Sequence, residues 1–304
     1  MSASMENFMR EFNLYLDELP QRPNTETEMN KALQDFMKIY NDSLDIPKKL
    51  TESTAKTSYD FMELAETAKS KKKRLAYLEK AYELDDHNFD AALDLIIETV
   101  KGPLERHRRV QELLEKAIAM MKAEGFYTKD CIGDFWQLAG TRPFMRLYRA
   151  YMDELAAQDK FRLAAETGQE MLRLCKNDNL GIRFVLMDYY AVLQERKPAE
   201  KLFKKYKDST ALLSLPMSYM YYQLGDEKNA QAHLQIMLDN VKDTKKFFNS
   251  KGHIPDCYRP SPYGIQLGTM DEYYDCFTRA ASTLYENAEY WEWAKETIKG
   301  MKKS

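Results

Sequence analysis

The sequence predicts an all-α protein, and three observations support that fold class. Charged residues make up 31% of the chain, whereas only 11 of its 304 residues are Gly and 10 are Pro, a composition that favours helices over strands and turns. Apolar residues recur at i, i+3 and i+4 spacing along almost every segment, which is the period of an amphipathic helix. Short polar joints interrupt this pattern at similar intervals, which indicates helices packed in consecutive pairs.

Residues 1–45 are expected to form an N-terminal helical hairpin. The apolar stripe of its first helix consists of Met5, Phe8, Met9, Phe12, Leu16 and Leu19. Pro20 and Pro23 end this helix, because proline lacks a backbone donor and clashes with the preceding turn. Thr25 and Glu28 have the spacing of a capping box at the start of the second helix. The stripe of that helix consists of Met29, Leu33, Phe36, Met37 and Tyr40.

A second region, residues 57–300, is expected to be one continuous stack of helix pairs. The turns inside three of these pairs are centred near residues 159, 196 and 226, which are 37 and 30 residues apart. Their mean spacing is close to the 34-residue period of a tetratricopeptide repeat, so the sequence predicts a helical-repeat solenoid of that kind. An aromatic helix around "EYWEWAKE" is expected to close the stack.

One joint between pairs, in "RLCKNDNLGIRFVL" (173–186), has no real loop between two helical patterns. Asp178 or Asn177 is expected to cap the second helix by accepting a hydrogen bond from its free N–H groups. Gly181 is expected in the first turn of that helix, where a small residue lets adjacent helices approach closely. The alternative for this stretch is a direct binding role for Asn179.

Three phrases carry a resemblance to a family. The chain has "FWQLAGTRPFMR" (135–146), "LCKNDNLGIRF" (174–184) and "IPDCYRPSPYGIQLGTMDEYYDC" (254–276). Residues 57 to 290 resemble a group of bacterial tetratricopeptide-repeat proteins, mostly uncharacterised, with phrases like Trp…Glu-Thr-Arg-Pro-Tyr-Met-Arg and Asn-Asp-Asn-Gln-Gly-Ile-Arg. Gly140 replaces the usual Glu of the first phrase and Leu180 the Gln of the second. The resemblance implies a helical-repeat fold and no established activity.

The strongest candidate site is a basic cluster on two successive pairs. Arg142, Arg146 and Arg149 share one helix face, and Asn179 and Arg183 share a face of the next first helix. First helices line the concave surface of such a solenoid, where guanidinium groups bind carboxylate or phosphate. Charge reversal at Arg146 and Arg183 would then weaken partner binding. The alternative is pairing inside the chain, with carboxylates such as Asp134, Asp153 or Asp188.

Other features are weaker signals. The Tyr- and Met-rich "MSYMYYQL" (217–224) suits an adaptable contact surface, but such side chains also fill gaps between stacked helices. Two runs are basic, "KSKKKR" (69–74) and "RHRR" (106–109). The first is expected to begin a second helix and to stay solvated, with nucleic-acid binding as the alternative. A net charge of −3 and a pI near 6.0 argue against nucleic acid and anionic membranes as partners.

No catalytic motif is present in the sequence, and we predict no catalytic residues, no metal and no cofactor. The Gly-rich phosphate loop, the Gly-x-Ser-x-Gly elbow and His-Glu-x-x-His are all absent from it. His253, Cys257 and Cys276 have the wrong number and spacing for a structural zinc site. Cys131 lies in a predicted loop, where it is either a reactive thiol or, as for most isolated cysteines, inert.

These observations favour an interaction scaffold that binds a protein or peptide segment, an acidic one in particular, on a concave helical surface. The alternative is a regulator that responds to a peptide or small ligand, and an enzyme is disfavoured. Scattered cysteines and the lack of a signal-like N-terminus or a roughly 20-residue apolar span predict a cytoplasmic protein without a membrane segment. The oligomeric state stays open.

Overall fold

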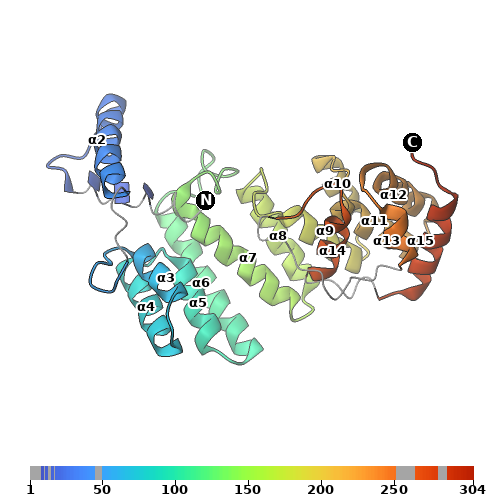
Figure 1. Cartoon of the computed structure of the whole chain (residues 1–304), viewed down its shortest axis with the longest axis horizontal. Helices are drawn as coiled ribbons and strands as arrows, with labels where there is room; N and C mark the ends of the chain where they lie inside the picture. The colour runs from blue at the N-terminus through green and yellow to red at the C-terminus, as the bar shows by residue number, and fades with distance from the viewer. Residues whose placement is uncertain are drawn as a thin grey trace. The chain divides into compact units, whose positions relative to one another are not determined.

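A computed structural model describes residues 18–44, 50–250, 264–279 and 286–304, together with positions 8, 9, 11, 12, 15 and 16 (Figure 1). The chain forms two compact units, Met1–Tyr151 and Met152–Ser304, and each is described by itself. Every regular element in these ranges is helical and none is a β-strand, so the predicted all-α class is confirmed. The predicted division into a hairpin at 1–45 and repeats at 57–300 stays a prediction.

The first unit contains α2 and, after it, four helices that pack in sequence. The bounds are α2 Glu26–Leu44, α3 Ser58–Glu66, α4 Lys71–Leu84, α5 Phe89–Thr99, α6 Pro103–Ala123 and the 3-10 turn η1 Ala139–Thr141. Helix α7, Arg142–Ala156, begins in this unit and ends in the second. Neighbours α3 and α4, α4 and α5, and α5 and α6 are in contact.

The two N-terminal segments share a small aromatic core. Phe12 and Leu16 are buried against Ala32 and Phe36 of α2. The Thr25 hydroxyl accepts from the Glu28 backbone N–H at 3.2 Å, and the Glu28 carboxylate accepts from the Thr25 N–H at 3.2 Å, which confirms the capping box. Because Phe12 and Leu16 pack against Phe36, the two predicted apolar stripes face each other.

The second unit is a run of helices in contact with their neighbours. The bounds are α8 Phe161–Leu174, α9 Ile182–Val192, α10 Arg196–Tyr206, α11 Ala211–Gln223, α12 Glu227–Asn240, α13 Thr244–Asn249, α14 Met270–Thr278 and α15 Ala288–Gly300. Helix α9 packs against α8, α10 and α11, and α11 also packs against α12. Among the described residues, no helix combines the length and apolar composition needed to cross a bilayer.

Three turns in this unit have the same geometry. Each contains a residue with positive φ, namely Asp159, Gln194 and Gly225, which are 35 and 31 residues apart. In each, the next N–H bonds back to a carbonyl five residues earlier, as in Lys160 to Leu155. This is the hydrogen bond of a Schellman cap. The turns therefore lie where the sequence predicted breaks between helices.

The joint before α9 confirms one prediction and corrects another. The Asp178 carboxylate accepts from the Ile182 N–H at 2.6 Å and from the Arg183 N–H at 3.0 Å, so it caps α9 as expected. Gly181, however, precedes the first turn, and its φ is +65°. A Cβ there would meet the Phe184 ring of its own helix at 3.3 Å and no neighbouring helix. Gly181 is therefore required by backbone conformation, and the predicted helix–helix packing role is wrong.

The glycine that does permit close packing is Gly168 on α8. A Cβ at this position would lie 3.3 Å from Met152 Sδ and 3.4 Å from atoms of Ile182 and Leu186. Such distances leave no room for an added methyl group without a shift of these side chains. Helices α8 and α9 therefore approach each other closely at Gly168.

Three substitutions of different size test why position 181 requires glycine. We expect Gly181→Ala and Gly181→Leu to lower the free energy of unfolding by about 1–2 kcal/mol, because non-glycine residues are strained at positive φ. Gly181→Asn should cost less than Gly181→Ala although Asn is larger, since Asn tolerates this conformation. Thermal and denaturant unfolding would measure the order, and a cost that follows side-chain volume would contradict us.

His233 on α12 is buried between two aromatic rings. Its ring lies 4.7 Å from the Phe203 ring and 5.6 Å from the Tyr221 ring, centroid to centroid. Its Nδ1 atom is buried and has no hydrogen-bond partner among the described residues. Burial lowers the pKa of His233 to about 4.

This burial predicts a pH-dependent stability. The pKa of His233 in the folded state lies below its value of about 6.5 in the unfolded state. The contribution of neutral His233 to the free energy of unfolding is therefore fully present above pH 6.5 and is lost as pH falls towards 4. Over that window wild type should lose up to about 3 kcal/mol more than His233→Leu. Denaturant unfolding between pH 4 and 7 would show this difference. Parallel pH curves for the two proteins would mean that His233 is not buried in its neutral form.

Candidate functional site

The predicted arginines on α7 contact other groups of the first unit. The Arg146 Nε donates to Asp90 Oδ1 at 2.8 Å, and a second guanidinium nitrogen donates to Asp90 Oδ2. Arg142 donates to the Trp136 carbonyl at 2.8 Å and lies over the Trp136 ring. Arg149 is half-buried on the same helix. Arg146 is thus already in a bidentate ion pair with its own chain.

Arg183, in the second unit, is held by two carboxylates and two rings. Its guanidinium lies 2.9 Å from Asp178, whose side chain is fully buried, and 3.4 Å from Asp208. It also lies over the Phe184 and Tyr206 rings, at 4.0 and 5.4 Å from their centroids. The pKa of Asp178 is raised, because the effect of burial exceeds the opposite effect of the hydrogen bonds from Arg183. The Arg183 cation compensates for a carboxylate taken out of water.

Asn179 is the one member of the predicted set that is exposed, and it accepts a weak hydrogen bond from Cys175 at 3.4 Å. Arg146 and Arg183 follow the alternative considered from the sequence, pairing within the chain: Arg146 binds Asp90, and Arg183 binds Asp178 and Asp208. Asp188 instead forms a buried pair with Arg279, Nε to Oδ2, at 2.5 Å.

Helix α10 carries the densest group of solvent-facing cations in the second unit. In its run "RKPAEKLFKKYK" (196–207), six cations accompany a single carboxylate, Glu200, and all six are exposed: Arg196, Lys197, Lys201, Lys204, Lys205 and Lys207. Arg196 is neutralised by Glu200 at 2.7 Å and Asp226 at 3.0 Å. We call the remaining five the α10 lysines: Lys197, Lys201, Lys204, Lys205 and Lys207.

The α10 lysines have no carboxylate partner among the described residues. Lys205 donates to the Tyr206 hydroxyl at 3.2 Å, and the other four make no hydrogen bond or ion pair there. The acidic groups nearest in sequence are already occupied. Glu195 pairs with Arg162 at 2.6 Å, and Asp208 pairs with Arg183 at 3.4 Å. Within the described ranges, no carboxylate therefore neutralises the charge of the α10 lysines.

The sequence of α10 explains how such a basic segment stays helical. Ala199 and Leu202 are fully or nearly buried and attach one face to the core. Pro198 lies in the first turn, where its missing N–H is not needed. Lys204 and Lys205 lie in the last turn, where cations interact favourably with the helix dipole.

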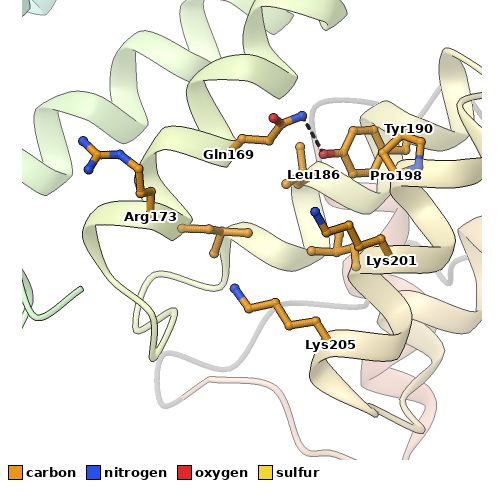
Figure 2. A pocket seen from close by; sticks show the side chains of 9 residues that line it. Gln169, Arg173, Leu186, Tyr190, Pro198, Lys201 and Lys205 are labelled. Carbon is orange, nitrogen blue, oxygen red and sulfur yellow. Dashed lines mark hydrogen bonds between the residues drawn. The ribbon is translucent and has the colours of Figure 1, made fainter. Parts of the chain in front are cut away.

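A groove of about 330 Å³ lies beside α10, between it and α8 with α9 beneath (Figure 2). Its apolar lining consists of Leu172, Leu186, Pro198 and Leu202. Lys201 and Lys205 extend from α10 towards α8, as Figure 2 shows. On the opposite edge, Gln169 donates to the Tyr190 hydroxyl at 2.9 Å. The groove thus combines an aliphatic floor with two unneutralised ammonium groups.

The groups that line the groove suit the binding of an anion. Arg173, also a lining residue, is bound to Glu170 at 2.6 Å, and in Figure 2 its guanidinium points away from the two lysines. Burial raises the pKa of Tyr190, so this hydroxyl stays protonated at neutral pH. Lining cations, an amide and a protonated phenol can hold a carboxylate but supply no general base.

Neither a cysteine nor a member of the possible metal-ligand cluster lines this groove. Asp85, Asp86 and His87 form the one cluster of possible metal ligands in the described ranges. Both ring nitrogens of His87 are engaged, Nδ1 with Asp86 at 2.9 Å and Nε2 with Glu124. Burial raises the pKa of Cys276 to about 12, so it is inert as a nucleophile, whereas Cys131 is half-buried. His253 and Cys257 lie outside the described residues.

Sequence reasoning missed the α10 lysines. The signal was present, because six cations against one carboxylate within twelve residues is a local excess of charge. The arginines of α7 and α9 drew attention instead, since bidentate binding favours Arg over Lys. Only the structure reveals that Arg146 and Arg183 are paired with carboxylates, whereas the α10 lysines have no carboxylate partner in the part of the chain that it describes.

Reversing the charge of Arg183 should now affect folding. We expect Arg183→Glu to lower the free energy of unfolding by about 2 kcal/mol, because it leaves the buried Asp178 beside a like charge. Lys201→Glu is the matched control, with an expected change within about 0.5 kcal/mol for an exposed site. Urea unfolding would compare the two. Equal stability of both variants would show that Arg183 does not support the joint.

Comparison of the chain with protein-family models, with curated proteins and with solved structures finds no match.

Proposed function

We propose that this protein is an interaction scaffold that binds an acidic segment of a partner protein along α10 and the groove between α8 and α10. One observation carries the proposal. The five exposed α10 lysines have no carboxylate partner in the described chain, and two of them, Lys201 and Lys205, line an open aliphatic groove. Lysines and leucines side by side match a ligand that carries both carboxylates and aliphatic side chains.

A tetratricopeptide-like solenoid is part of the proposal. The equivalent turns at Asp159, Gln194 and Gly225 recur close to a 34-residue period, and α9 packs against the first helix of the next pair, α11. Solenoids of this kind present long surfaces on which a partner segment can lie. Since α10 is the second helix of its pair, the proposed site differs from the first-helix surface expected from the sequence.

A protein segment fits this site better than a nucleic acid. The whole chain carries a net charge of −3, which repels a polyanion outside the local α10 field. The groove beside Lys201 is floored by leucines, whereas single-stranded nucleic acids are held by aromatic stacking platforms. A cytoplasmic location, which the scattered cysteines favour, belongs to the same proposal.

A defined peptide tests the proposal directly. The probe is a fluorescent peptide of Glu and Leu, with two matched controls in which Lys replaces Glu or Ser replaces Leu. We expect the Glu/Leu peptide to bind, both controls to bind at least about tenfold more weakly, and affinity to fall with salt, because about 0.1 M salt screens exposed charges beyond roughly 10 Å. Fluorescence anisotropy at several salt concentrations is the measurement.

Two double variants of the protein distinguish the effect of the proposed site on peptide binding from the effect of overall net charge. Lys201→Glu/Lys205→Glu should weaken binding of the Glu/Leu peptide about tenfold or more, through lost attraction at the groove edge. Lys101→Glu/Lys228→Glu makes the same change in net charge at exposed positions outside the groove and should have little effect. Equal weakening by both double variants, or tighter binding of single-stranded RNA than of the peptide, would overturn the proposal.

A further inference from the structure

Helix α10 has a second groove on its other side. This groove, about 460 Å³ in volume, lies between α10 and α12 and is lined by apolar surface of Phe203 and Ile236. Lys204 and Lys207 also line it, whereas Lys201 and Lys205 line the groove towards α8. Four of the five α10 lysines are therefore divided between two apolar grooves that share α10 as their common wall, and Lys197 lines neither.

The second groove has the same charge imbalance as the first. Lys204 and Lys207 are exposed and make no hydrogen bond or ion pair with any described residue. The single carboxylate in its lining, Asp208, is held by Arg183 at 3.4 Å and hydrogen-bonds to the Thr210 N–H at 2.9 Å. Carboxylates from outside are again the complementary groups.

We infer that one acidic segment of the partner crosses α10, with an apolar side chain in each groove and its carboxylates on the lysines between them. This inference rests on the proposed function and adds the second groove to it. A helix with its side chains is about 10–12 Å wide, so an extended chain crosses it in roughly four residues. The recognised pattern is then two apolar residues separated by about four, mostly acidic, residues.

Linkage of the two apolar residues gives a measurable signature. Once the first residue occupies one groove, the second binds the other groove at high effective concentration. A peptide with Leu at both ends of a spacer of about four Glu should therefore bind at least about tenfold tighter than peptides with one Leu. Shortening the spacer to about two Glu should remove this gain, because the chain no longer spans α10.

Protein variants assign the effect to each groove. Binding of the two-Leu peptide should weaken about tenfold in Lys204→Glu/Lys207→Glu and by a similar factor in Lys201→Glu/Lys205→Glu. Lys101→Glu/Lys228→Glu is the control of equal net charge. Lys204→Gln/Lys207→Gln provides a milder version if the reversal disturbs the end of α10. Circular dichroism would establish that each variant is folded.

Photo-crosslinking supplies a readout that does not depend on affinity. With photoreactive leucine at each end of the peptide, mass spectrometry should find one end attached near Leu186 or Leu202 and the other near Phe203 or Ile236.

The inference is overturned, and the proposed function survives, if Lys204→Glu/Lys207→Glu behaves like the control while Lys201→Glu/Lys205→Glu weakens binding. If neither pair differs from the control, both the inference and the proposed function fail.

Discussion

The ion pair between Asp178 and Arg183 is the interaction on which the geometry of the candidate site depends. Asp178 is buried, and it accepts hydrogen bonds from the first N–H groups of α9 as well as from the Arg183 side chain. Arg183 in turn binds Asp208, just beyond α10, and lies over Tyr206 in the last turn of that helix. One carboxylate therefore fixes the start of α9 against the end of α10. These two helices form the floor and one wall of the groove, so its shape follows from this joint.

Arginine and lysine have different tasks in this unit, and the difference follows from their chemistry. Arg183 and Arg279 are largely buried and bind carboxylates, which a planar guanidinium does with several hydrogen bonds at once. The ammonium of lysine is a strongly hydrated point charge, and burying it is costly. Lysines accordingly remain on the exposed face of α10, where their charge is accessible to a partner. The carboxylates near α10 are paired with arginines. They therefore would not compete with an acidic segment of a partner for the lysines.

Local chemistry was predictable from the sequence, and long-range pairing was not. The capping box at Thr25 and the Asp178 cap follow from residue types a few positions apart, and the structure has both. The partner of Arg146 is Asp90, 56 residues away, which no local pattern indicates. Gly181 was identified as special for the wrong reason, because a positive φ and a close helix contact both select glycine. The α10 lysines required knowledge of which neighbouring carboxylates were already paired.

The charge arrangement on α10 also links partner binding to stability. Lys197 and Lys201, and Lys201 and Lys205, are i, i+4 pairs of like charge, and each such pair disfavours a helix by about 0.2–0.5 kcal/mol. The helix persists because Ala199 and Leu202 are packed into the core and outweigh this repulsion. Carboxylates placed between these lysines would remove the repulsion as they bind. A ligand that binds only the folded state raises its stability. Part of the binding energy at this site would therefore come from relief of a strain that α10 already carries, which is why an acidic segment would be favoured there over a neutral apolar one.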